Sequence, residues 1–509
     1  MTQSSAARGA PGDAPQDQFD PYALPPEATQ EPPRQFTRIL RQIGPGLILA
    51  GAIVGTGELI QTTHLGAKAG FVLLWLVLLS CFVKVFVQVE LGRYAIASGR
   101  PTMTAFREIG GVGNFIGLCW VLMMLMTQLQ LGAMVGGVGQ ALHLAMPNVS
   151  PTLGRLIGGR AAEYLALRPE VPWAALTALV TCALLAAGSY KLVESGTTIM
   201  VVLFTFGTML CVALLPLAGH PIPWDEVAGG FTFSLPHHAV PAAIAMFGIT
   251  GVGAAELIAY PYWCIEKGYA RRAGPADASE NWLERARGWI RVMQVDAWVS
   301  MVVYSLATLA FFFLGATVLY GQGGLPGNVG EMTEALRSMY APVMGAAGSK
   351  WFIVIGVMAV LYSTLYAATA ANARALTDFL RVNGVFRLRG PGDRIKWVRR
   401  FCIAFPLVDL ATYLLVRNPV LMVTIGGFVQ ALMLPMVGGA ALFLRYRRTD
   451  RRLTAGLVWD VFLWTSVAAL TATAAIGLND TRKKLAAWSS PPPATAPATS
   501  PVATGVAGR

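Results

Sequence analysis

Two short motifs place a glutamate close behind paired glycines, inside long apolar stretches of the chain. The first motif is GTGELI at residues 55–60, and the second is GVGAAELI at residues 251–258. Glycine costs about 1 kcal/mol relative to alanine inside a helix, so paired glycines favour local unwinding. At membrane depth, unwound backbone and a carboxylate are tolerated where they are buried in protein or line a wet cavity. Both motifs therefore predict an interrupted helix beside a binding site.

The two motifs together supply the residues that we expect to bind a substrate. Carboxylate and carbonyl oxygens are hard ligands, which suit Mg²⁺ or Mn²⁺ better than soft transition metals. The expected metal ligands are Glu58 and Glu256. The full set of expected substrate-binding residues is Gly55, Thr56, Gly57, Glu58, Gly253, Ala254, Ala255 and Glu256.

A packing role is the alternative interpretation of the same motifs. Glycines also allow membrane helices to approach closely, and the chain has 54 of them. The two glutamates would then pair internally with Lys84 or His64. Because both the glycines and the glutamate are duplicated, we favour the binding site. Further polar residues in apolar stretches could line a pathway, and the candidates are His64, Lys84, Gln128 and Gln430.

Composition decides the class of protein that carries these motifs. Of the 509 residues, 55% are hydrophobic and 13% are charged, whereas soluble domains carry about 25% charged residues. A soluble enzyme, a nucleic-acid-binding domain and a disulfide-rich scaffold are therefore excluded. The six cysteines lack metal-ligand spacing, and no phosphate-binding or hydrolase motif occurs. The sequence predicts an all-α polytopic membrane protein that is not an enzyme and uses no cofactor.

Eleven apolar stretches are candidates to cross a bilayer core of about 30 Å. The tails at residues 1–33 and 487–509, rich in proline and alanine, are expected to be disordered. The expected spans are 43–65, 71–92, 116–142, 173–189, 198–218, 239–265, 292–319, 351–370, 401–416, 420–443 and 456–477.

The two motifs also indicate an internal repeat. They lie in the first and sixth spans, so five spans separate them and the second copy enters the membrane in the opposite orientation. This arrangement is typical of an inverted-topology repeat. We expect a core at residues 34–445 with repeats at about 43–218 and 239–443, followed by a final helix and its flank at 446–486.

The distribution of basic residues predicts the orientation in the cell membrane. With a cytoplasmic N-terminus, the inner segments hold most of the 39 lysines and arginines, including those of 266–291, 371–400 and 444–455. This excess agrees with the positive-inside rule. With an odd number of spans, the C-terminus would lie outside.

A run from Gly44-Pro45-Gly46 to Gly66-Ala67 is followed by Leu73-Leu74-Trp75. This run is similar to the start of the Nramp family of divalent-metal transporters, and the resemblance extends over residues 38–445. Looser likeness occurs at Tyr362-Ser363-Thr364 and Leu434-Pro435. The resemblance implies a LeuT-type fold, in which two inverted five-helix repeats carry broken first and sixth helices at the substrate site. One extra helix would complete the eleven.

The chain departs from the family at the positions that bind metal. Aligned on the glycine–proline–glycine opening, the family's Asp, Pro and Asn fall on Gly55, Thr56 and Glu58, and only Gly57 is retained. The family's Met-Pro-His of the sixth helix falls on Gly253, Ala254 and Ala255, and its acidic pair in the third helix falls near Gln128 and Leu131. The thioether that favours transition metals is thus missing. In this respect the chain is similar to related magnesium transporters that lack the same ligands.

These observations predict a secondary transporter or facilitator of a divalent cation, with Mg²⁺ or Mn²⁺ favoured. A transporter of a small organic solute is the alternative, and a membrane sensor that retains the fold is a second one. Proton symport needs a relay of Asp, Glu or His on facing helices, whereas residues 116–142 offer glutamines. We therefore expect weak or no proton coupling, with acid inhibiting transport by neutralising the glutamates. The expected partners are the substrate and the lipid bilayer.

Overall fold

The computed structural model describes residues 21–22, 24, 28–44, 54–188, 190–277, 279–321 and 324–489. Within these ranges the chain forms helices and no strand, so the all-α prediction is confirmed. Residues 45–53, which belong to the first expected span and include Pro45 and Gly46, lie outside the described residues. Most of the two expected tails lies outside them as well.

The helical elements follow one another with short connections. In the first half of the chain they are α1 (Phe36–Leu40), η2 (Gly57–Thr62), α3 (Thr63–Ala69), η3 (Gly70–Leu73), α4 (Leu74–Ser98), α5 (Thr102–Glu108), α6 (Gly111–Ala145), α7 (Val149–Ile157), α8 (Gly159–Leu167), α9 (Val171–Ala187), α10 (Tyr190–Leu214), η4 (Leu215–Ala218) and α11 (Trp224–Gly229). In the second half they are η5 (His237–Ala239), α12 (Val240–Ile249), α13 (Ala254–Glu266), α14 (Tyr269–Ala273), α15 (Glu280–Val318), α16 (Val329–Ser338), α17 (Ala341–Val357), η6 (Met358–Tyr362), α18 (Ser363–Val382), α19 (Pro391–Val416), α20 (Pro419–Arg447), η7 (Arg451–Leu453) and α21 (Leu457–Ser489).

Eight helical stretches of the described chain are long and apolar enough to cross a membrane. The stretch Gly57–Ser98 contains parts of the first two expected spans, because a short turn at η3 joins α3 to α4. The fourth expected span corresponds to the shorter apolar helix α9. The ninth corresponds to α19, whose apolar part lies between Arg400 and Arg417. Every expected span thus coincides at least in part with a described helix.

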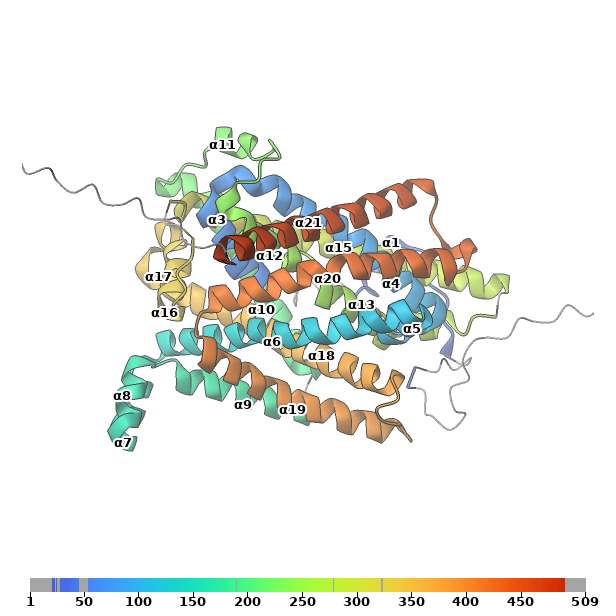
Figure 1. Cartoon of the computed structure of the whole chain (residues 1–509), viewed down its shortest axis with the longest axis horizontal. Coiled ribbons are helices and arrows are strands. Elements are labelled where there is room, and N and C mark those ends of the chain that lie inside the picture. The colour runs from blue at the N-terminus through green and yellow to red at the C-terminus, as the bar shows by residue number, and fades with distance from the viewer. Residues whose placement is uncertain are drawn as a thin grey trace, which may run out of the picture.

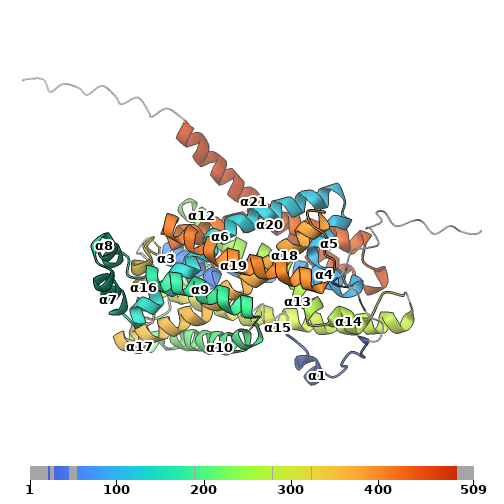
Figure 2. The same cartoon turned by 90° about the horizontal axis from the view of Figure 1, so that it is seen from below.

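The long helices run side by side along one direction of the molecule, as α6, α20 and α21 show in Figure 1. The short helices α7 and α8 lie beyond one end of this bundle, and α14 lies toward the other (Figure 2). Close packing inside the bundle depends on glycine where α12 meets α20. A Cβ atom at Gly248 would lie 1.9 Å from the carbonyl oxygen of Gly427. Small residues let the two backbones touch, as at other membrane helix interfaces.

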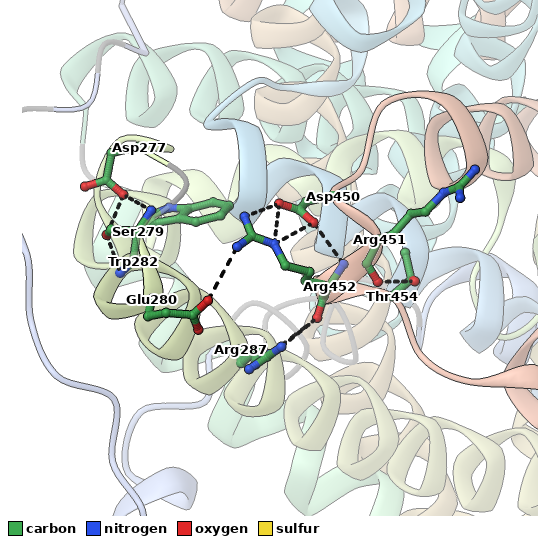
Figure 3. A network of polar contacts seen from close by, with 9 residues as sticks. All are labelled: Asp277, Ser279, Glu280, Trp282, Arg287, Asp450, Arg451, Arg452 and Thr454. Atoms are coloured by element: carbon green, nitrogen blue, oxygen red, sulfur yellow. Dashed lines mark hydrogen bonds and ion pairs between the residues drawn. The ribbon is translucent and has the colours of Figure 1, made fainter.

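A polar network at the α14 end connects the start of α15 to the loop between α20 and α21 (Figure 3). Arg452 pairs with Asp450 at 2.8 Å and with Glu280 at 3.6 Å, and Arg287 donates to the carbonyl oxygen of Arg452. The hydrogen bonds from Arg452 hold the pKa of Asp450 below its ordinary value. The network therefore joins two parts of the chain that are far apart in sequence.

The described part of the N-terminal segment also contacts the bundle. The Tyr22 hydroxyl donates to Asp378 of α18 and accepts a 2.5 Å hydrogen bond from Arg394 of α19. Further along, Trp289 of α15 donates to the carbonyl oxygen of Gln30 at 2.9 Å. These contacts tie residues 22 and 30 to three helices of the bundle.

Candidate functional site

The second motif forms a real break between two short helices. The helix α12 ends at Ile249, and α13 begins at Ala254. Between them Thr250 is extended, with ψ of 141°, and Gly251 has φ of 70°, which favours glycine. The break leaves the last carbonyl groups of α12 and the first N–H groups of α13 without helical partners. Side chains from elsewhere in the chain bind to these carbonyl and N–H groups.

The first motif lies against this break and forms a π-helical turn, η2. Single turns of this kind are frequent at functional sites. A Cβ atom at Gly57 would lie 3.2 Å from the carbonyl oxygen of Ile249, which shows how closely the two motifs approach. The hydroxyl groups of Thr62 and Thr250 lie 3.0 Å apart. The two motifs therefore meet, as the repeat predicts, whereas residues 45–53 of the first span lie outside the described residues.

Glu58 joins the two interrupted helices through backbone hydrogen bonds. One carboxylate oxygen accepts from the N–H group of Gly55 at 3.2 Å, and the other accepts from the N–H group of Gly251 at 3.2 Å. The side chain is completely buried, with 0% of its surface exposed. Both oxygens of Glu58 thus already have partners within the protein.

Lys84 of α4 binds carbonyl groups at the end of α12. Its ammonium donates to the carbonyl oxygens of Phe247 and Thr250, the latter at 2.7 Å, and to the hydroxyl of Ser80 at 3.0 Å. In the described residues it therefore does not pair directly with Glu58 or Glu256. His64, the other expected partner, accepts a 2.9 Å hydrogen bond from the N–H group of Leu325.

A chain of neutral hydrogen bonds connects the first motif to the second. Gln130 of α6 donates to the hydroxyl of Thr56 at 2.9 Å, and Gln430 of α20 donates to Gln130 at 3.1 Å. The side-chain oxygen of Gln430 then accepts from the N–H group of Ala255 at 3.1 Å, in the first turn of α13. These contacts position two helices of the bundle around the site.

Glu256 lies in the first turn of α13 and lines a cavity. Unlike Glu58 it is partly exposed, and its Oε2 atom has no hydrogen-bond partner in the described part of the chain. A Cβ atom at Gly253 would lie 2.4 Å from this oxygen and 2.6 Å from Oε1 of Gln430, so glycine leaves room for both. The residues that line the cavity are Thr127, Gln130, Leu131, Met134, Ala255, Glu256, Ala259, Trp263, Thr364, Ala368, Ala371, Asn372 and Gln430.

The structure brings some predicted residues together and leaves others apart. Of the four pathway candidates, Gln430 lines the cavity, whereas His64, Lys84 and Gln128 are not among its lining residues. Gln128 is buried, and its amide has no partner among the described residues. The buried residue Ala254 starts α13 without reaching the cavity.

The predicted site did not include Thr127, Met134, Thr364 and Asn372, which α6 and α18 bring to the cavity. Thr127, Gln130, Leu131 and Met134 all line it, and they follow the i, i+3, i+4, i+7 spacing of one helix face. This spacing identifies the residues of α6 that face the cavity once Gln130 is placed inside the bundle. Thr364 and Asn372 of α18 carry no comparable local signal.

The donor set of the cavity limits the kinds of metal site that it can form. In the described residues no group of three or more His, Cys, Asp or Glu side chains could hold a metal ion. Glu256 is the single carboxylate that lines the cavity, and the other polar lining groups are amides and hydroxyls. Such a site can hold a cation that keeps part of its water shell, or a polar organic molecule.

Comparisons with known proteins agree with this architecture. The chain is 24% identical over 451 residues to the divalent metal cation transporter MntH of Ralstonia nicotianae, covering 88% of this chain and 92% of that protein. It is 25% identical over 450 residues to the protein of the same name from Xanthomonas campestris pv. campestris, covering 87% and 90%.

Solved structures show the fold. The Eremococcus coleocola manganese transporter, in complex with an aromatic bis-isothiourea compound, matches with a TM-score of 0.63 at 17% identity, over 91% of this chain and 90% of that one. The transporter Mhp1 of the nucleobase-cation-symport-1 family matches with a TM-score of 0.54 at 13% identity, over 91% and 93%. Both share the LeuT-type fold, so the predicted fold class is confirmed.

The family is established by a match over most of the chain. The model of the natural resistance-associated macrophage protein-like family, Nramp, matches residues 46–479. The predicted resemblance is therefore confirmed. The protein is a non-enzymatic, multi-pass membrane protein, and the chain belongs to the Nramp family.

Proposed function

We propose that this protein is a secondary transporter or facilitator of a divalent cation, with Mg²⁺ or Mn²⁺ preferred over softer metals. The observation that carries this proposal is Glu256, whose unpartnered carboxylate oxygen lies at the start of α13, beside a cavity lined by amides and hydroxyls. A negative charge inside a membrane protein is costly and marks a substrate or ion pathway by default. The relatives named divalent metal cation transporters support the same class of substrate.

The preference for a hard cation follows from the donor atoms. Besides Glu256, the side chains with oxygen donors that line the cavity are Thr127, Gln130, Thr364, Asn372 and Gln430. Met134 is the single sulfur-bearing residue among the lining residues, and it stands on α6 rather than at the break. Oxygen ligands suit Mg²⁺ and Mn²⁺. Mg²⁺ usually keeps several waters and needs one or two carboxylates, so one glutamate can suffice.

Transport by this site is weakly coupled to protons or not coupled. Glu256 is the titratable residue among those lining the cavity, and a carboxylate that binds the cation cannot carry a proton independently. Acid therefore inhibits uptake, because protonation removes the charge that attracts the cation.

The basic residues of 371–400 and 444–455 support a cytoplasmic N-terminus in the cell membrane.

A small organic solute is the second candidate substrate. It is favoured by the donor set, because the described residues lack the three acidic, histidine or cysteine side chains that metal cages use. Trp263 and the amides of the cavity could bind an apolar body and a polar tip, and Glu256 would face an amine.

Uptake into proteoliposomes tests the proposal. The purified protein should take up Mg²⁺ or Mn²⁺, and Glu256→Gln should reduce this uptake by about 10- to 100-fold. The matched control is Glu226→Gln, which changes an exposed glutamate of α11 and should leave uptake unchanged. A pH-sensitive dye inside the vesicles should report no fixed stoichiometry of protons. Isothermal titration that detects an organic ligand and no divalent cation would contradict the metal proposal.

A further inference from the structure

A single peptide group at the helix break is held by two buried titratable side chains, Lys84 and Glu58. The carbonyl oxygen of Thr250 accepts a 2.7 Å hydrogen bond from the Lys84 ammonium. The N–H group of Gly251, which belongs to the same peptide group, donates to the Glu58 carboxylate at 3.2 Å. The peptide dipole thus lies between Lys84 and Glu58, with each end facing the charge that it favours.

The surroundings of Lys84 are those of a small cation site. Three oxygens surround the ammonium: the carbonyl oxygens of Phe247 and Thr250 and the hydroxyl of Ser80. The aromatic ring of Phe247 adds a fourth contact, with its centroid 4.9 Å from Nζ. Lys84 is completely buried, at 0% exposure. Unwound carbonyls at the C-terminal end of a half-helix are the kind of group that coordinates a Na⁺ ion in transporters with broken helices.

We propose that the Lys84 ammonium occupies a monovalent-cation site at this break and takes the place of an exchangeable alkali ion. Lys84 is thus a positioning residue. It neutralises the negative end of α12, and together with Glu58 it fixes the peptide group from which the second motif continues into α13. The presence of Glu256 in the first turn of α13 makes this position relevant to substrate binding. The uptake measurements that test this inference rest on the proposed function, whereas the stability measurements do not.

Removing the ammonium should create a dependence on alkali ions. In Lys84→Ala the three oxygens and the space left by the side chain remain, so Na⁺ or K⁺ should enter and restore the break. We expect the thermal stability of the purified wild-type protein to be equal in NaCl, KCl and N-methylglucamine chloride at one ionic strength. The stability of Lys84→Ala should fall in N-methylglucamine chloride and rise saturably with Na⁺ or K⁺. The control Lys68→Ala, at the end of α3, should show no such rescue.

The stability measurement needs no transported substrate, so its failure can be told apart from failure of divalent-cation transport. If the thermal stability of Lys84→Ala is the same in all three salts, or if the variant fails to fold in all of them, the proposal is wrong. A wild-type protein that is itself stabilised by Na⁺ would also overturn it. Where uptake can be measured, alkali ions should rescue the uptake of Lys84→Ala in the same order as its stability.

A double variant gives an independent test of the charged pair. Glu58→Gln and Lys84→Met should each destabilise the protein, because each leaves one buried charge uncompensated. The double variant should lose less than the sum of the two losses. Additive losses would show that the two charges act separately, and would contradict a shared peptide group as their connection.

Discussion

The two glutamate motifs look alike in sequence and differ in what their glutamates do. Glu58 of the first motif is completely buried, and both of its oxygens accept backbone hydrogen bonds. Glu256 of the second motif is partly exposed, lines the cavity and has an oxygen without a partner in the described chain. The inverted repeat has thus produced one glutamate whose oxygens bind the backbone at both motifs and one that lines the cavity, which we propose binds the substrate. The predictions below test this division of roles.

The largest effect on stability should come from Glu58→Gln. This change keeps the shape of the side chain but leaves the Lys84 ammonium without its compensating charge across the peptide group. Each of the two backbone hydrogen bonds that the carboxylate accepts is worth about 1.5–3 kcal/mol, and the substitution weakens both. Thermal or chemical unfolding of the purified protein in detergent measures the loss. If the stability of Glu58→Gln equals that of the wild type, Glu58 is not the structural member of the pair.

Glu256→Gln should reverse this pattern, with a loss of transport and little change in stability. The Oε2 atom of Glu256 has no hydrogen-bond partner in the described part of the chain, so little stability should depend on this oxygen. We expect cation affinity or uptake to fall by about 10- to 100-fold, the range seen when groups around a metal ion are altered. Uptake and unfolding measured on the same preparation check both halves of this expectation. If the Glu256→Gln variant were strongly destabilised but kept the wild-type affinity, Glu256 rather than Glu58 would be the structural glutamate.

A smaller effect is expected where the two motifs are connected through neutral groups. Gln130→Ala removes the residue that donates to Thr56 and accepts from Gln430. Leaving buried polar groups unsatisfied costs about 1–3 kcal/mol. Because Gln130 also lines the cavity, the Michaelis constant for uptake should rise together with the loss of stability. Gln128→Ala is the matched control on the same helix, and it should leave the Michaelis constant unchanged, because Gln128 does not line the cavity.

The smallest effect should follow His64→Ala. His64 accepts one hydrogen bond from the N–H group of Leu325 and lies outside the cavity lining. Losing one such hydrogen bond costs about 0.5–1.5 kcal/mol. Cation affinity and its dependence on pH should stay as in the wild type. An altered pH profile of uptake in His64→Ala would indicate that His64 belongs to the transport pathway after all.

The sequence by itself determined the class, the fold and the position of the break in the second motif. Low charge and long apolar runs require a membrane protein, since every backbone polar group in a bilayer must be satisfied internally. Paired glycines followed by glutamate, repeated five spans apart, predicted two interrupted helices that meet. The break between α12 and α13 has this position, and Gly251 adopts the positive φ that glycine permits.

Only the tertiary structure decided which glutamate is free and which charges are compensated. Glu58 and Glu256 stand in nearly the same local sequence, but distant parts of the chain surround them. Glu58 accepts a hydrogen bond from Gly251, 193 residues away. Beside Glu256, the N–H group of Ala255 donates to Gln430, 175 residues away. Likewise, the packing alternative would have paired Lys84 with a carboxylate, whereas the structure gives it the carbonyl groups of α12. Local patterns predict periodicity, burial and breaks in helices. The partner of a buried polar group depends on which helices pack together, and that is set by the whole fold.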